Sequence, residues 1–223
     1  IASAIIRDNV WFLSTFWGLP DQQRKGVGMP LLKQLWQAGK EAGATTFFTH
    51  SSPDTTAMAV YMKMGMRPGH QIIYFKGKPA QLPNAAKGFE AAPLEKAVAM
   101  DLDLQIRGTR REPDHEYWLG AGGMQGRQVL NRGRVVGYYY LGRGGIGPAA
   151  WNEPETANAV LGIACREATI TTPEVRFAVP SINHSALRFA LNSGLRVTSV
   201  FHFLTTVSFG QMYQYIPSGP ALY

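Results

Sequence analysis

A short glycine-containing loop carries the clearest chemical signal in the sequence. Gly26 and Gly28 lie two residues apart, directly after the cations Arg24 and Lys25, and Pro30 follows them. Glycine lets a backbone approach a ligand closely, and the amide groups at the start of a helix attract an anion. Pro30 is tolerated in a first helical turn, where an amide hydrogen has no partner within the helix. The loop therefore indicates an anion site, with pyrophosphate as the natural ligand; an ordinary strand-to-helix turn is the alternative.

The elements that position this loop follow from periodicity and stop signals. Two apolar runs flank Asp8 and Asn9, a pair suited to a tight hairpin turn. Alternating apolar and polar faces predict a helix after Pro30, and Gly43 is a fitting end for it. The predicted elements are strands at 1–6 and 10–18, a helix from about 30 to 43, a strand at 45–49, a helix at 55–64 and a strand at 71–75.

The same unit of helix, strand, helix and strand occurs twice. Residues 48–74 align with residues 177–203 at a constant offset of 129, which matches Gly65 with Gly194. Between the copies, residues 76–92 collect Gly and Pro without periodicity and predict a linker. We therefore expect two domains, at 1–85 and 86–223. The second is predicted to open with a helix at 93–106 and strands at 128–130, 135–141 and 146–151.

Residues 23–28 read Q-R-K-G-V-G, which matches the pattern Q/R-x-x-G-x-G/A. Downstream, Asp54 opens a helix that carries Tyr61 seven positions on and closes with Gly65 and Met66. The chain resembles the GNAT superfamily of N-acetyltransferases in these motifs, and its two copies resemble the tandem members. Asp54 and Met66 depart from the Asn and Phe that are common there. The implied fold class is α/β, with helices on a mixed sheet of the α+β kind. It comprises two GNAT-like domains. The first domain is expected to lack about 50 residues of its N-terminal part.

The resemblance implies acetyl-CoA as co-substrate and no metal. The cofactor-binding residues that it implies are the backbone of Phe16, Trp17 and Gly18 for the acetyl-pantetheine, Gln23, Arg24, Lys25, Gly26, Val27 and Gly28 for the pyrophosphate, and Asp54 for the pantetheine arm.

Tyr61 is the residue that the resemblance implies as the acid. Attack of an amine on a thioester builds an oxyanion and then expels a thiolate, so an acid is needed near the sulfur. A tyrosine with its ordinary pKa of about 10 stays protonated at neutral pH and can serve; a packed helix aromatic is the alternative. No carboxylate lies between Val10 and Gly18, so His50 is the candidate base. His50 could equally be structural or exposed, and the base could be water or lie in a preceding segment.

The second copy lacks the glycine loop and the tyrosine of the first copy. At the offset of 129, Gly26 corresponds to Glu155, and Tyr61 corresponds to Ala190. A carboxylate in that loop would repel pyrophosphate. We therefore expect 86–223 to be a degenerate GNAT copy without catalysis.

A second glycine motif, G-x-G-x-x-G, is made by Gly142, Gly144 and Gly147. A dinucleotide-binding loop should run into a helix, whereas Pro148 follows directly and 146–151 is typical of another strand. The motif therefore predicts a hairpin turn.

Composition sets the broad class. Apolar residues make up 45% and charged residues 17% of the 223, which is typical of a globular chain. The single cysteine, Cys165, allows no disulfide within the chain and is expected to pack in the core. No apolar run is long enough to span a bilayer, so we expect no membrane partner and a cytoplasmic protein. The net charge of +7 attracts polyanions, but a phosphorylated cofactor explains it as well as nucleic acid does.

The leading hypothesis is an acetyl-CoA-dependent N-acetyltransferase that acts on a primary amine by direct transfer, with the acceptor bound near the seam between the domains. The acceptor is a small-molecule or protein amine, and a homodimer is an open alternative for the assembly. The competing hypothesis is a non-catalytic acyl-CoA-binding or assembly module. A nucleic-acid binder is a third, disfavoured hypothesis, because it rests on charge alone.

Overall fold

The computed structural model describes residues 1–22, 25–84, 87–142, 145–219 and 222. The chain forms two compact units. Unit 1 comprises Ile1–Gln71 and Phe201–Phe209, and unit 2 comprises Ile72–Val200 and Gly210–Tyr223.

The elements predicted for the first copy are present in the structure, and unit 1 adds part of a strand from the second copy. Its elements are β1 (Ala2–Arg7), β2 (Val10–Phe16), a 3₁₀ turn (Pro20–Gln22), α1 (Gly28–Glu41), β3 (Thr46–Ser51), α2 (Thr55–Lys63) and the first part of β4 (Arg67–Gly77). The predicted hairpin joins β1 to β2, and Asp8 takes a left-handed φ of 50° in its turn. β2 pairs with β3 in parallel, and β3 pairs with β10 (Arg196–Thr205) in antiparallel. The sheet of unit 1 is therefore mixed, in the order β1-β2-β3-β10.

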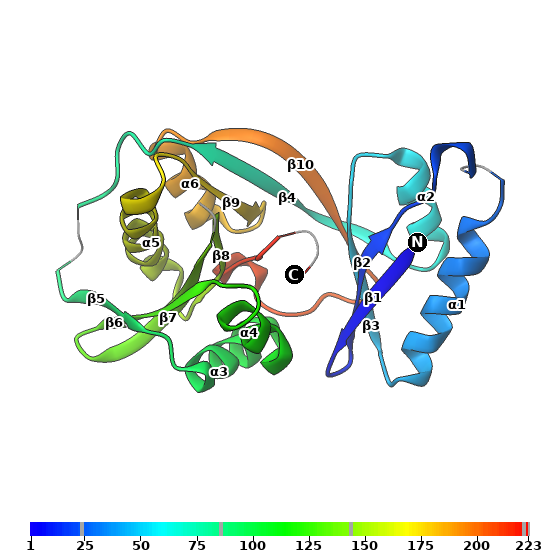
Figure 1. Cartoon of the computed structure of the whole chain (residues 1–223), viewed down its shortest axis with the longest axis horizontal. Coiled ribbons are helices and arrows are strands. Elements are labelled where there is room, and N and C mark those ends of the chain that lie inside the picture. Colours follow the sequence, from blue (N-terminus) through cyan, green and yellow to red (C-terminus); the bar gives the residue numbers. More distant parts are fainter. Residues whose placement is uncertain (23–24, 85–86, 143–144, 220–221, 223) are drawn as a thin grey trace. The chain divides into compact units, whose positions relative to one another are not determined.

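Helices α1 and α2 lie on one side of the β1–β3 strands (Figure 1). The apolar face of α1 buries Leu32, which is fully inaccessible, and Trp36, and α2 buries Tyr61. Trp36 stacks on Phe47 of β3 with ring centroids 4.1 Å apart, and Trp11 of β2 lies 5.6 Å from Trp36. This aromatic core fixes α1 against the strands, and therefore sets where the helix begins.

Unit 2 contains the remaining elements. They are the rest of β4, β5 (Phe89–Pro93), α3 (Lys96–Arg107), α4 (Glu112–Leu119), β6 (Gln125–Asn131), β7 (Arg134–Gly142), β8 (Gly145–Trp151), a 3₁₀ turn (Pro154–Thr156), α5 (Ala157–Thr171), β9 (Val175–Pro180), α6 (His184–Asn192), the first part of β10, a 3₁₀ turn (Met212–Gln214) and β11 (Tyr215–Ile216). Its strands run in the order β4-β9-β8-β7-β6-β5, and β11 pairs with β8.

Two boundary predictions for unit 2 were wrong. The predicted linker, 76–92, contains most of strand β5, which pairs with β6 from Phe89↔Asn131 to Pro93↔Arg127. The helix predicted from 93 begins at Lys96 instead, because Pro93 belongs to that strand. Strand β5 is last in the order, so the missing amide of Pro93 is tolerated at an edge.

Two local predictions for unit 2 are confirmed. Strands β7 and β8 pair as a hairpin, with Leu141↔Ile146 and Gly142↔Gly145 in register, so a strand and not a helix follows the second glycine motif; residues 143 and 144 lie outside the described residues. Cys165 is fully buried in α5, and burial raises the pKa of its thiol to about 12, as expected for core packing.

The repeat is visible in the elements themselves. Helix α1 begins at Gly28 and α5 at Ala157, and α2 begins at Thr55 and α6 at His184, so both pairs keep the offset of 129. The hairpins that precede these helices have a different offset, because β2 begins at Val10 and β8 begins at Gly145, which is an offset of 135. The difference between the two offsets is six residues. The strand-to-helix loop of the second copy is therefore six residues shorter than that of the first.

The last strand of each copy pairs outside its own copy. Strand β4 ends the first copy, yet its residues Ile72–Gly77 pair with β9 in unit 2. Strand β10 ends the second copy, yet its residues 202–205 pair with β3 in unit 1. The boundaries of the compact units therefore differ from those of the predicted domains at 1–85 and 86–223. The predicted domains describe the two copies in the sequence, and this division of the chain into domains stays a prediction.

Candidate functional site

Strands β2 and β3 separate at one end. Their parallel pairing runs from Val10↔Thr46 to Leu13↔Thr49, although β2 continues to Phe16 and β3 to Ser51. The hydroxyl of Thr49 donates to the carbonyl oxygen of Leu13 at 3.1 Å and closes the paired part. We call the opening between residues 14–16 and 50–51 the fork. Thr49 was not predicted as a site residue, and a strand threonine is too common to have signalled this role.

The peptide groups of Phe16 point into the fork. Trp17 and Ile1 exchange two hydrogen bonds, with the Trp17 N–H donating to the Ile1 oxygen at 2.9 Å and the Ile1 nitrogen to the Trp17 oxygen at 2.8 Å. In an antiparallel pair of strands, residues that exchange two hydrogen bonds alternate with residues whose N–H and C=O groups point away from the partner strand. Ala2↔Phe16 is the next pair in register, so the N–H and C=O of Phe16 point away from β1.

Helix α1 begins close to the fork with an uncapped N-terminus. Val27 precedes the helix without a side-chain hydrogen bond, and the first turn contains no acidic residue. The first amide groups of a helix have no partner within it, and they carry the positive end of its dipole. Gly26 takes a φ of 82°, which glycine adopts without strain, and the cation Lys25 beside it is exposed. The loop and helix start therefore favour an anion.

The ring of Phe16 joins the separate parts of the site. A Cβ atom on Gly28 would lie 3.2 Å from Cζ of Phe16, so a side chain there would press on the ring. The ring centroid of Tyr61, on α2, lies 6.2 Å from that of Phe16. The fork, the start of α1 and Tyr61 are therefore neighbours in space. The sequence motifs had indicated only that these residues belong to one family pattern.

Tyr61 is held as a neutral phenol. Only 5% of the residue is exposed, and it packs in the core of unit 1. Burial, and to a lesser extent the nearby charge of Asp54, raise the pKa of Tyr61 to about 12. A phenol with that pKa keeps its proton through the neutral range and can donate it to a developing anion.

Asp54 caps α2. Its Oδ1 accepts from the N–H of Thr56 at 2.8 Å and of Ala57 at 3.3 Å. This is the usual work of an Asp at a helix N-cap. Because a carboxylate is an acceptor only, Asp54 can bind an N–H group of a ligand but cannot donate to a ligand carbonyl.

His50 lies at the fork but not beside Tyr61. Side chains alternate along a strand, and His50 shares a face of β3 with Phe48, whereas Phe47 packs on the opposite face with Tyr61. The His50 ring has Phe12 at 5.8 Å and Phe203 at 5.9 Å between centroids. The structure therefore does not bring the two predicted catalytic residues together, and alternation along the strand was the signal that could have shown it.

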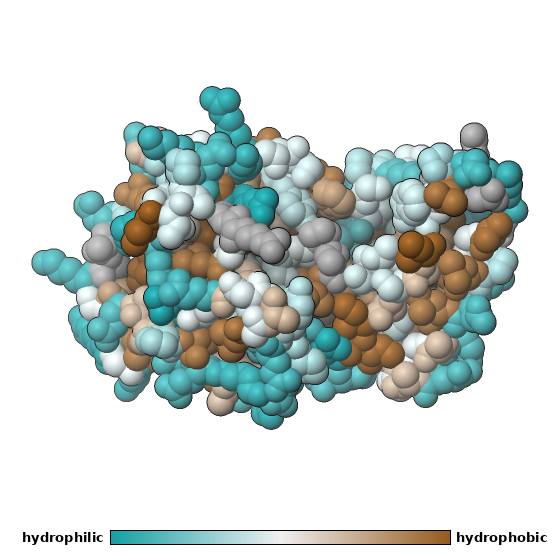
Figure 2. All heavy atoms as spheres, viewed as in Figure 1, coloured by the Kyte–Doolittle hydropathy of each residue, from teal (hydrophilic) through white to brown (hydrophobic). Residues whose placement is uncertain are grey.

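The other predicted loop residues lie on the surface or outside the described residues. Trp17 is 52% exposed, and its peptide groups serve β1 rather than the fork. Gly18 follows it in the exposed loop, and Val27 is 59% exposed. Figure 2 shows apolar surface in the region of β1, β2 and α1. Gln23 and Arg24 lie outside the described residues.

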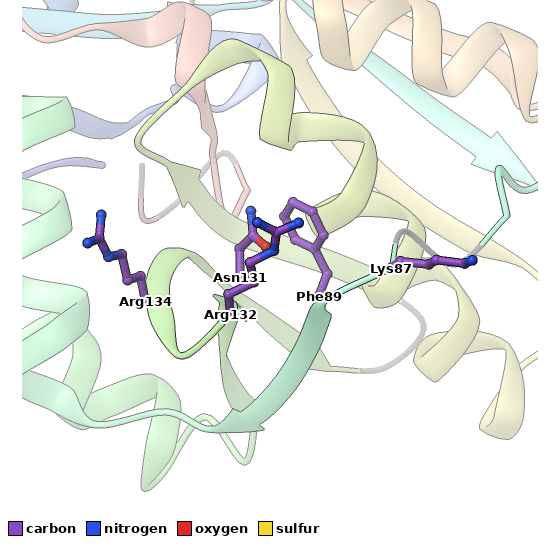
Figure 3. Close-up of a pocket in the computed structure, with 5 residues that line it drawn as sticks. All are labelled: Lys87, Phe89, Asn131, Arg132 and Arg134. Atoms are coloured by element: carbon purple, nitrogen blue, oxygen red, sulfur yellow. The ribbon is translucent and has the colours of Figure 1, made fainter.

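Unit 2 has a hollow of about 730 Å³ beside β5 and β6. Lys87, Arg132 and Arg134 line it together with Phe89 and Asn131. Figure 3 shows Lys87 and Arg134 extending away from each other, so the three cations do not converge on one point. We assign no site to this hollow.

Within the described ranges, no group of three or more His, Cys, Asp or Glu residues is placed to hold a metal ion. No helix of the same residues is long and apolar enough to cross a membrane.

Residues 1–66 match the model of the acetyltransferase (GNAT) family. The matched stretch contains the fork, the loop and Tyr61, so the predicted resemblance to this family is confirmed. No curated protein matches the chain significantly.

Solved structures resemble most or all of the chain. The Pyrococcus horikoshii protein named "Putative Acetyltransferase" has a TM-score of 0.80 at 16% identity, over 100% of this chain and 75% of its own. A GCN5-related N-acetyltransferase from Sphaerobacter thermophilus has a TM-score of 0.61 at 14% identity, over 92% and 75%. A tandem GNAT protein from the clavulanic acid biosynthesis pathway has a TM-score of 0.56 at 13% identity, over 88% and 74%. At these identities the similarity concerns the fold, and it confirms the predicted α/β fold with a mixed sheet.

Proposed function

We propose that the first copy is an acetyl-CoA-dependent N-acetyltransferase that transfers the acetyl group directly to a primary amine of a small molecule or protein. The observation that carries the proposal is the junction at Phe16. There, peptide groups that point into an open fork adjoin an uncapped, acid-free helix N-terminus and a buried tyrosine.

The fork and the loop would bind the co-substrate. The N–H and C=O of Phe16 can pair with the amide groups of the pantetheine arm, as a further strand would. The amides of Gly28 and Met29, with Lys25 beside them, can hold the pyrophosphate. Pro30 donates nothing, so these amides and the Leu31 amide are the donors of the first turn.

Acetyl-CoA supplies an acyl carbon that is activated as a thioester. In the transfer, the amine nitrogen forms the new bond to this carbon, and the carbon–sulfur bond breaks. Tyr61 gives its proton to the departing sulfur and regains one from solvent, and the amine loses a proton to a base. We propose His50 or water as that base, because β2 and β3 contain no Asp or Glu.

The test is to incubate the protein with acetyl-CoA and a broad panel of amines, and to follow both thiol release and acetylated product. We expect thiol release that depends on one class of amine. The proposal fails if the protein neither binds nor hydrolyses acetyl-CoA.

A non-catalytic acyl-CoA-binding or assembly module is the second candidate. It is favoured by the missing carboxylate on β2 and β3 and by the position of His50 on the other strand face from Tyr61. Tight binding of acetyl-CoA without any acetylated amine across the panel would support the module over the enzyme.

A further inference from the structure

A short segment of unit 2 pairs with strand β8, which corresponds to β2, one of the two strands that form the fork in the first copy. Strand β11 pairs in antiparallel with β8 through Tyr215↔Ala150 and Ile216↔Ala149. Tyr215 and Ile216 are fully buried. By contrast, the register of β8 with its parallel neighbour β9 consists of Gly145↔Arg176 alone.

Hydrogen bonds establish which residues of the two copies correspond. The N–H of Asn152 donates to the oxygen of Val136 at 3.0 Å, as that of Trp17 donates to Ile1. Both residues of this pair are offset by 135, and the register Gly137↔Trp151 likewise repeats Ala2↔Phe16. Trp151 therefore takes the place of Phe16, and Ala149 and Ala150 take the places of residues 14 and 15.

In the second copy, this segment makes hydrogen bonds to Trp151 and Asn183. These residues correspond to Phe16 and Asp54, which are proposed to bind the pantetheine arm in the first copy. The side-chain amide of Gln214 donates to the carbonyl oxygen of Trp151 at 3.0 Å. Asn183 corresponds to Asp54 at the offset of 129, and its Oδ1 likewise caps its helix by accepting from the N–H of Ala186 at 3.1 Å. The Nδ2 of Asn183 donates to the carbonyl oxygen of Tyr215 at 3.1 Å.

A buried ion network anchors the Tyr215 side chain. Arg111 donates to the Tyr215 hydroxyl at 2.9 Å and, through Nε, to Asp103 at 2.6 Å. Asp103 also contacts His115 at 2.9 Å, and the guanidinium of Arg107 lies 5.1 Å from the centre of the Tyr215 ring. All these side chains are at most 3% exposed. Buried charges are costly unless every hydrogen bond is made, so the network favours the state in which Tyr215 stays in place.

The segment also fills the available space. A Cβ atom on Gly147 of β8 would lie 2.5 Å from the carbonyl oxygen of Pro217. Such a contact is too short for any side chain, so β8 and residues 214–217 are in close backbone contact there.

We infer that residues 214–217 are a built-in ligand of the second copy, a short peptide, extended at Tyr215 and Ile216, that occupies the fork where the first copy would bind an acyl-pantetheine. This copy therefore binds no cofactor of its own. The inference rests on the proposed function for the identity of the first copy's ligand, but the occupancy of the second fork stands on the contacts above.

Amide hydrogen exchange of the complete chain, with and without saturating acetyl-CoA, tests this occupancy. We expect slow exchange at Tyr215 and Ile216 that acetyl-CoA leaves unchanged, new protection at 28–31, and one cofactor per chain by calorimetry. Two cofactors per chain, with exchange at Tyr215 and Ile216 accelerated about tenfold or more, would overturn the inference. Exchange at these two residues as fast as in exposed loops, in the protein alone, would also overturn it.

The same experiment separates this inference from the proposed function. If no acetyl-CoA binds but Tyr215 and Ile216 remain slow, the proposed function fails and the built-in ligand stands. A matched pair of variants adds a second test. Gly147→Ala should accelerate exchange at Tyr215 and Ile216 about tenfold or more, because its Cβ displaces the segment. Gly133→Ala, also at a positive φ but with nothing within 4 Å of its Cβ, should not. Equal behaviour of the two variants would count against the inference.

Discussion

Removal of the Tyr61 hydroxyl should slow the chemical step with little effect on the fold. Proton transfer by a positioned acid contributes about 10²- to 10⁴-fold, so Tyr61→Phe should lose about 2.7 to 5.4 kcal/mol of transition-state stabilisation. The ring keeps its contact with Phe16, because only an oxygen is lost. The loss should therefore lie in kcat, and KM for acetyl-CoA should be nearly unchanged.

The pH profile gives a second readout of Tyr61. A tyrosine with the ordinary pKa of about 10 would be half ionised at pH 10, and its activity as an acid would be halved. With the pKa raised to about 12, only about 1% is ionised at pH 10, so the alkaline fall in kcat should begin near pH 11.

Initial rates of thiol release between pH 6 and 11 provide the assay. Tyr74→Phe is the matched control, because burial also raises the pKa of Tyr74 to about 12 and this residue belongs to the part of β4 in unit 2. The reasoning is refuted if Tyr61→Phe keeps more than about a third of the parental kcat, or if Tyr74→Phe loses as much.

Three further predictions concern unit 1. Asp54→Asn keeps the helix cap but removes the charge that helps to raise the pKa of Tyr61, so the alkaline limb of kcat should move to lower pH; an unmoved limb would contradict this. Leu32→Ala should lower the free energy of unfolding by about 2 to 5 kcal/mol in urea titration, because Leu32 is fully buried, and a loss below about 1 kcal/mol would contradict the assigned core. Burial lowers the pKa of His70 from 6.5 to about 4, so the unfolded chain takes up a proton first and stability should fall as the pH drops from about 6.5 to 4. His70→Phe, which keeps the stacking on Phe203, should flatten that fall, and an unchanged slope would show that another group causes it.

The local elements of the first copy could be predicted because their signals are local. The turn at Asp8, the glycine loop and the caps at Asp54 and Gly65 each act within a few residues of themselves. Strand β5 was missed because five residues that end in a proline resemble a linker when the partner strand is not known.

Long-range pairing could not be predicted from the sequence. Nothing in the composition of β4 or β10 shows that each pairs outside its own copy, because pairing depends on which edges meet in the fold. Strand β11 has only two residues, which is too short for any periodic signal. The six-residue difference between the loops became visible only when the hydrogen bonds of both hairpins could be matched.

For the candidate site, the sequence indicated the loop and Tyr61 but not their common neighbour. The ring of Phe16 links Gly28 to Tyr61 through contacts that no spacing rule contains. The role of Asp54 as a helix cap was compatible with its motif. The motifs did not show that His50 lies on the face of β3 opposite to the one that packs with Tyr61.

The central claim is that acetyl-CoA binds at the fork and at the start of α1. Calorimetric titration of acetyl-CoA into the parent protein and into Gly28→Asp and Gly28→Asn tests it most directly. Asn has nearly the shape of Asp, so both variants press on Phe16 alike, and a carboxylate at a helix N-terminus does not weaken the helix. We predict binding by the parent, weaker binding by Gly28→Asn, and a further loss of about hundredfold or more in Gly28→Asp, because a carboxylate about 4 Å from a phosphate repels it by up to about 4 kcal/mol. No binding by the parent, or equal affinities of the two variants, would contradict the claim.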